Sequence, residues 1–230
     1  MTLEVPRQNH QKVTYSENHI EDAGFVLIFL LKIVVIHFIT AVIHESAHIL
    51  TCIAFGGEVT EIQFVFLGIS ATWKHIDGIQ GAIISLSGAG SVALLSLFVY
   101  RPLFSKSKTL FAKQLCLIGI VQLSQEMFYW TFGSLLGGFS FPWQTTGSVV
   151  DPLYLAQSLS MTSFVYIFSL IFFPLFFLCR KLNKTVLSEY CSLISVQSIG
   201  QTEWKSKFVL YTIKIYIILF QILNIVTFVF

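Results

Sequence analysis

The chain contains 230 residues, of which 55% are hydrophobic and only 11% are charged. Soluble domains carry about 25% charged residues, so this composition excludes an ordinary soluble enzyme. Lys and Arg outnumber Asp and Glu by 14 to 12, and the sequence has no basic run interleaved with aromatic residues, which argues against a nucleic-acid partner. We therefore expect an integral, multi-pass protein of a lipid bilayer.

Five apolar runs are long enough to cross a bilayer, which takes about 20 residues for a helix. The predicted fold is accordingly an all-α polytopic membrane protein. A polar N-terminal segment, residues 1–24, precedes the first run, and residues 179–207 are expected to form a polar loop before the last one. The predicted transmembrane helices cover residues 25–55, 79–100, 115–136, 153–178 and 208–230.

A short stretch after the first apolar run has a different pattern. Between Val59 and Phe66, apolar and polar side chains alternate, as in Ile62-Gln63-Phe64. A period of two is typical of a half-buried β-strand rather than of a helix. We therefore expect a short amphipathic β-like segment here, followed by a turn at Gly68.

The distribution of Lys and Arg between the short loops predicts the orientation of the chain. Loops rich in these residues remain on the cytoplasmic side of a membrane. With five helices, this rule places the N-terminus in the cytoplasm. The basic residues of the two expected cytoplasmic loops are Arg101, Lys106, Lys108 and Lys113 in one, and Arg180, Lys181, Lys184, Lys205 and Lys207 in the other.

The first apolar run contains the sequence His44-Glu45-Ser46-Ala47-His48, an HExxH motif. At about 100° per residue, His48 lies about 40° and Glu45 about 100° from His44 around the helix axis. Two imidazoles on one face of a helix can bind one Zn²⁺, with the Glu as general base. Ionisable groups inside a membrane indicate a functional site, because burying them in hydrocarbon is costly.

Together with its surroundings, this motif resembles the site-2 protease family of intramembrane zinc metalloproteases. The resemblance covers a core at residues 25–178 and includes the Gly56-Gly57 pair, the strand-like Val59–Phe66 and the small residues Ser87–Ser91 of the second helix. It implies cleavage of a membrane protein substrate in or near a transmembrane segment, with the substrate held by strand addition. The chain lacks the Leu-Asp-Gly motif that commonly supplies the third zinc ligand in that family.

A catalytic zinc site has three protein ligands and an open position, so a third ligand is needed. Asp151 begins the fourth predicted helix, at the membrane side where the HExxH helix ends, and its depth is suitable. An Asp followed by a Pro, here Pro152, is also a common helix start, so capping is the alternative to ligation.

Glu126 is the other carboxylate inside a predicted membrane helix, one turn after Gln122 on the same face. Three roles are open to it. It can be an alternative third ligand, a partner of a zinc-bound imidazole, or a hydrogen-bonding group between helices.

The sequence thus predicts a zinc metalloendopeptidase in which His44, His48 and Asp151 bind Zn²⁺ and Glu45 is the catalytic residue. The alternatives are a metal-binding membrane protein without proteolytic activity, and a helix-bundle transporter or scaffold. Because the sequence offers no sensing domain that could control substrate access, we expect regulation by a partner protein in the membrane.

Overall fold

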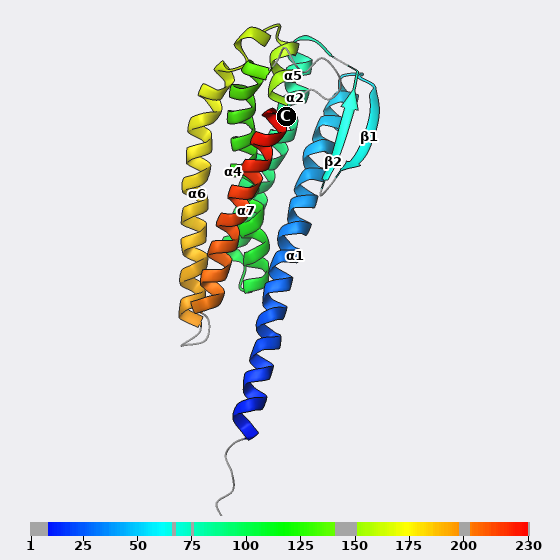
Figure 1. Ribbon diagram of the computed structural model, residues 1–230. Helices are drawn as coiled ribbons and strands as arrows, with labels where there is room; N and C mark the ends of the chain where they lie inside the picture. The colour runs from blue at the N-terminus through cyan, green and yellow to red at the C-terminus, as the bar shows by residue number, and fades with distance from the viewer. Residues whose placement is uncertain (1–8, 66–67, 75, 141–150, 198–202, 230) are drawn as a thin grey trace, which may run out of the picture.

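The computed structural model describes residues 9–65, 68–74, 76–140, 151–197 and 203–229, and most of them are helical (Figure 1). A single β-hairpin follows the first helix in the described part of the chain. The elements are α1 (Asn9–Ala54), β1 (Val59–Val65), β2 (Gly68–Trp73), α2 (Gly78–Leu94), the π-helical η1 (Leu95–Tyr100), α3 (Arg101–Lys106), α4 (Leu110–Ser140), α5 (Asp151–Ser158), the short η3 (Thr162–Phe164), α6 (Ile167–Gln197) and α7 (Glu203–Val229).

Three helical stretches are long and apolar enough to cross a membrane: Asp22–Ala54, Gly78–Lys106 and Trp204–Val226. The membrane character of the chain is therefore supported, whereas five spans are not shown. Polar side chains explain the difference. The continuous helix α4 contains a polar stretch that ends at Glu126, and α6 contains Arg180 only 13 residues after its start at Ile167.

Two predicted boundaries in the C-terminal half were wrong. The helix predicted at 153–178 is broken, because α5 ends at Ser158 and Ser160 adopts a left-handed backbone conformation with φ of 55°. Most of the loop predicted at 179–207 is helical, since α6 continues to Gln197. This segment is polar overall, but every fourth residue of one helix face is buried, namely Val186, Tyr190 and Ile194. These residues pack into the helical core.

The strand predicted at Val59–Phe66 is observed as β1, but its partner was missed. The turn expected at Gly68 was wrong: Gly68 is the first residue of β2, which pairs antiparallel with β1 and places Ile62 opposite Ala71. The hairpin lies beside the C-terminal end of α1 (Figure 1), with β2 next to the helix. On β1, Phe64 is 82% exposed.

α4 lies at the centre of the helical bundle and packs against α1, α6 and α7. A buried apolar cluster joins these helices, with Phe29 of α1, Leu117 of α4 and Val209 of α7 among its members. A polar contact also links three helices: His37 Nδ1 of α1 lies 2.9 Å from the Tyr216 hydroxyl of α7, and Gln122 Nε2 of α4 donates to that hydroxyl over 2.9 Å.

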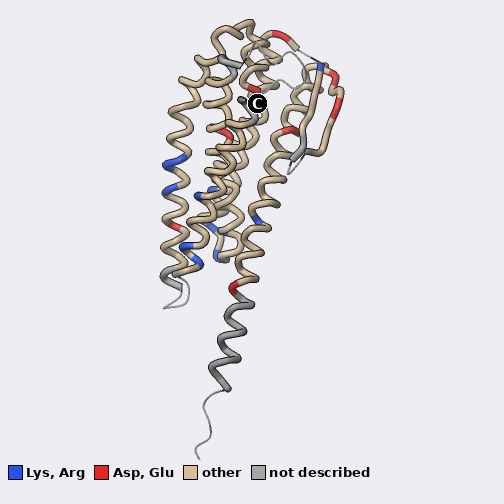
Figure 2. Tube along the Cα trace, viewed as in Figure 1, with Lys and Arg blue, Asp and Glu red and all other residues tan. Residues whose placement is uncertain are grey.

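The charged residues are distributed unevenly along the bundle (Figure 2). Most Lys and Arg residues lie in the half remote from the hairpin, whereas Asp and Glu are frequent near the hairpin. The basic-loop rule likewise places the Lys- and Arg-rich loops together on one side of a membrane.

At Gly81, α2 closely approaches both the segment that precedes it and α5. A Cβ at this position would collide with the backbone oxygen of Ile76 and lie 2.9 Å from Ser158 Cβ of α5. We predict that Gly81→Ala destabilises the protein by about 1–3 kcal/mol, because a backbone oxygen cannot rotate away. Thermal unfolding in detergent measures the effect. Gly24→Ala in α1, where the new methyl meets nothing within 4 Å, is the matched control and should be neutral or slightly stabilising.

Candidate metal centre

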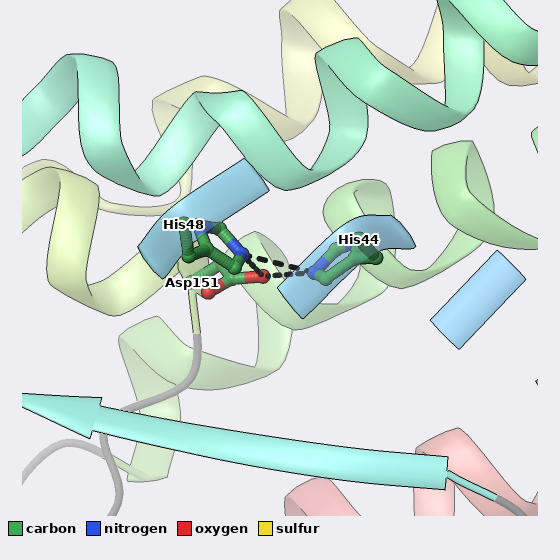
Figure 3. A group of neighbouring side chains, drawn as sticks. All are labelled: His44, His48 and Asp151. Atoms are coloured by element: carbon green, nitrogen blue, oxygen red, sulfur yellow. Dashed lines mark hydrogen bonds and ion pairs between the residues drawn. The ribbon is translucent and has the colours of Figure 1, made fainter. Parts of the chain in front are cut away.

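The two histidines of the HExxH motif lie on one face of α1, near its C-terminal end, and Asp151 approaches them from the start of α5 (Figure 3). The Nε2 atoms of His44 and His48 are 3.0 Å apart. Asp151 Oδ2 lies 3.2 Å from His44 Nε2 and 3.4 Å from His48 Nε2. The structure thus brings together the three side chains that the sequence proposed as ligands, from segments more than 100 residues apart.

The opposite edges of both imidazoles face hydrogen-bond acceptors. His48 Nδ1 lies 2.6 Å from the backbone oxygen of Ile84, and His44 Nδ1 lies 3.3 Å from Glu126 Oε2. A carbonyl or carboxylate oxygen only accepts hydrogen bonds, so it favours the tautomer with the proton on Nδ1. Both Nε2 atoms then carry lone pairs. With the Asp151 carboxylate, three electron-pair donors lie within 3.4 Å of one another, a group that could hold a metal ion.

The size of the trio fits a tetrahedral zinc ion. Ligand atoms at the usual bond lengths of about 2.0–2.2 Å and tetrahedral angles lie about 3.3–3.6 Å from one another. The separations in the trio, 3.0–3.4 Å, are close to that range. The site is also shielded, because the His48 side chain is 1% exposed and the His44 and Asp151 side chains are 14% and 13% exposed. Its composition of two imidazoles and one carboxylate is that of several catalytic zinc sites.

The backbone of Asp151 is held on both sides. Its N–H donates to the Tyr129 hydroxyl of α4 over 3.2 Å, and its carbonyl oxygen accepts a hydrogen bond of 2.5 Å from Ser85 Oγ of α2. Asp151 Oδ2 is thereby aimed at both imidazoles, an arrangement suited to ligation, although Asp151 also begins a helix.

Glu45, the second residue of the motif, lies close to the trio and contacts the hairpin. Its Oε2 accepts a hydrogen bond of 3.1 Å from the backbone N–H of Ala71 in β2. The N–H of Lys74 donates to the backbone oxygen of Glu58, on the side of β2 that faces β1. Because N–H groups alternate in direction along a strand, the N–H of Ala71, three residues earlier, points to the opposite side. The outer edge of β2 therefore faces α1 and Glu45.

Several residues that complete the site were not predicted. The indole ring of Trp73 packs against the His48 ring with centroids 5.3 Å apart, and Tyr154 meets Trp73 edge to face at 5.6 Å. Gly88 of α2 lies directly against both imidazoles. Only Gly88 had a signal in the sequence, namely its place among the small residues of the second predicted helix.

Comparisons of the chain with protein-family models, with curated proteins and with solved structures found no match. The interpretation of the site therefore depends on its residues and their geometry.

Proposed function

We propose that the protein is an intramembrane zinc metalloprotease of the site-2 protease type. The main support is the convergence of His44 Nε2, His48 Nε2 and Asp151 Oδ2 within hydrogen-bonding distance of one another, in a shielded site on an apolar helix. The adjacent carboxylate of Glu45 supplies the base that hydrolysis of a peptide bond requires.

In this proposal His44, His48 and Asp151 hold the ion. Zinc, when bound, supplies a Lewis acid that polarises the scissile carbonyl and makes water more acidic. Glu45 takes a proton from the attacking water and delivers it to the leaving amine. Its hydrogen bond with the Ala71 N–H holds the carboxylate between α1 and β2.

The substrate is a transmembrane segment of another membrane protein, which must unwind before attack because its carbonyls are bonded within the helix. The outer edge of β2 is a suitable place to hold the unwound chain by strand addition. The alternating stretch Val59–Phe66 is the other candidate for this role, and the alternative for it is a membrane-surface segment without a role in substrate binding. β2 is included here because it is the strand that borders Glu45.

We further propose a multi-pass topology with the N-terminus in the cytoplasm. The basic half of the bundle then faces the cytoplasm, and the hairpin and metal site lie toward the other side (Figure 2). Access of the substrate would be controlled by a regulatory partner in the membrane.

The proposal is tested by the zinc content of detergent-purified protein. We expect about one zinc per chain in the wild type and little in His44→Ala or Asp151→Ala, since each variant removes one of three ligands. His37→Ala is the matched control: it removes a histidine of the same helix whose Nδ1 contacts Tyr216 instead of the trio, and it should retain zinc.

Two results would contradict the assignment. Wild-type protein without zinc after reconstitution would exclude the protease and favour a helix-bundle transporter or scaffold. Zinc retained in Asp151→Ala but lost in His44→Ala would remove Asp151 from the ligand set.

A further inference from the structure

Glu126 of α4 contacts the metal centre from outside the trio. Its Oε2 lies 3.3 Å from Nδ1 of His44, whereas the Nε2 atom of the same ring faces Asp151 and His48. The two nitrogens of an imidazole point in different directions, so a group on Nδ1 does not share the ion that Nε2 faces. This geometry disfavours Glu126 as the third ligand.

The second oxygen of Glu126 is also engaged. Trp130, one turn further along α4, donates its indole N–H to Glu126 Oε1 over 2.9 Å. Trp130 is completely buried, and its ring lies 4.8 Å from that of Phe172 in α6. A fixed indole thus holds one oxygen of the carboxylate, which leaves the other directed at His44.

We propose that Glu126, oriented by Trp130, is a positioning residue that fixes the ring and tautomer of His44 and thereby raises the affinity of the site for zinc. The inference extends the proposed function. A carboxylate beside Nδ1 stabilises the proton on that nitrogen, prevents ring rotation and makes Nε2 a stronger electron donor. Partners of this kind contribute about 10- to 100-fold to metal affinity.

The two imidazoles differ in this respect. His48 is oriented by a neutral carbonyl, the backbone oxygen of Ile84, and its ring is further restrained by Trp73. His44 has a charged partner supplied by a side chain, so its contribution to metal binding can be changed by mutation. A simple hydrogen-bonding role between helices is the competing explanation, and Gln122 performs such a role one turn away through Tyr216.

The experiment compares zinc affinity, by competition with a chelator, and the absorption spectrum of the Co²⁺-substituted protein. We expect Glu126→Ala to bind zinc about 10- to 100-fold more weakly. Trp130→Phe, which keeps the ring but removes the N–H, should weaken binding less, and the double variant should bind no more weakly than Glu126→Ala. Glu126→Gln should shift the Co²⁺ bands, because it removes the charge beside Nδ1.

Gln122→Ala is the matched control, since it deletes an interhelical contact of α4 that does not touch a ligand. It should lower thermal stability without changing zinc affinity or the Co²⁺ spectrum. The inference is overturned if Glu126→Ala and Glu126→Gln behave like Gln122→Ala. If Glu126→Ala does not fold, Glu126→Gln and Trp130→Phe decide the matter. A wild type that binds neither metal would refute the proposed function itself, and this outcome is distinct from wild-type binding that Glu126 does not affect.

Discussion

Glu45→Gln is expected to reduce the cleavage rate by about 10²- to 10⁴-fold, the usual contribution of a general base, while the purified protein keeps its zinc. The amide of Gln cannot accept the proton of the attacking water. Its oxygen can still accept the hydrogen bond from Ala71 N–H, so the contact between α1 and β2 is preserved. The variant therefore separates the chemistry at Glu45 from the position of the hairpin.

The measurement is a comparison of new protein N-termini in membranes of cells that express the wild type or the variant. Glu61→Gln, the same change at an exposed position of β1, is the control, and we expect this variant to cleave the substrate at the wild-type rate. Unchanged cleavage in Glu45→Gln would exclude Glu45 as the base. A zinc-loaded wild type without any cleavage product would instead indicate a metal-binding protein that is not a protease.

Gly88→Ala is expected to weaken zinc binding by about 10- to 100-fold. A methyl group on Gly88 would lie 2.6 Å from both Cε1 and Nε2 of His44 and would also collide with Nε2 of His48. Overpacking costs about 1–3 kcal/mol, and here the displaced atoms are the proposed ligands themselves. One of the two imidazoles must rotate, so the loss should affect metal binding more than folding.

Gly90→Ala gives a matched comparison, because it makes the same substitution two residues away on α2, where the methyl meets nothing within 4 Å. Chelator competition on the two purified variants measures the difference. Wild-type zinc affinity in Gly88→Ala would show that α2 does not press against the histidine pair as the structure has it.

The part of the site that the sequence predicted depends on local geometry. The i and i+4 spacing of His44 and His48 fixes their common face once the segment is helical. Asp151 could be proposed from the expected chain topology, because the fourth predicted helix was expected to begin at the membrane side where the first one ends. Both arguments need only helix periodicity and the order of the apolar runs.

One missed feature had a local signal. β2, Gly68–Trp73, alternates apolar and polar residues from Ile69 to Trp73, which is typical of a strand, but Gly68 was expected to be a turn. Another missed feature depends on tertiary packing: the spacing of Glu126 and Trp130 on α4 was visible, but their direction toward His44 depends on how α4 packs against α1. The length of α6 was underestimated because the polar residues after Cys179 outnumber the three buried residues, Val186, Tyr190 and Ile194, that pack this part of the helix into the core.

If the protein is the proposed protease, the position of the candidate metal centre along α1 has a consequence for the two halves of a cleaved substrate. His48 lies six residues before the end of α1 at Ala54, which corresponds to about 9 Å of the roughly 30 Å of a hydrocarbon core. If the bilayer boundary lies at that end, a cut at this depth divides a transmembrane segment unequally. The fragment on the hairpin side retains too little apolar length to remain anchored and escapes into water. The other fragment keeps about two thirds of its span and stays in the membrane, so one product would be released and the other retained.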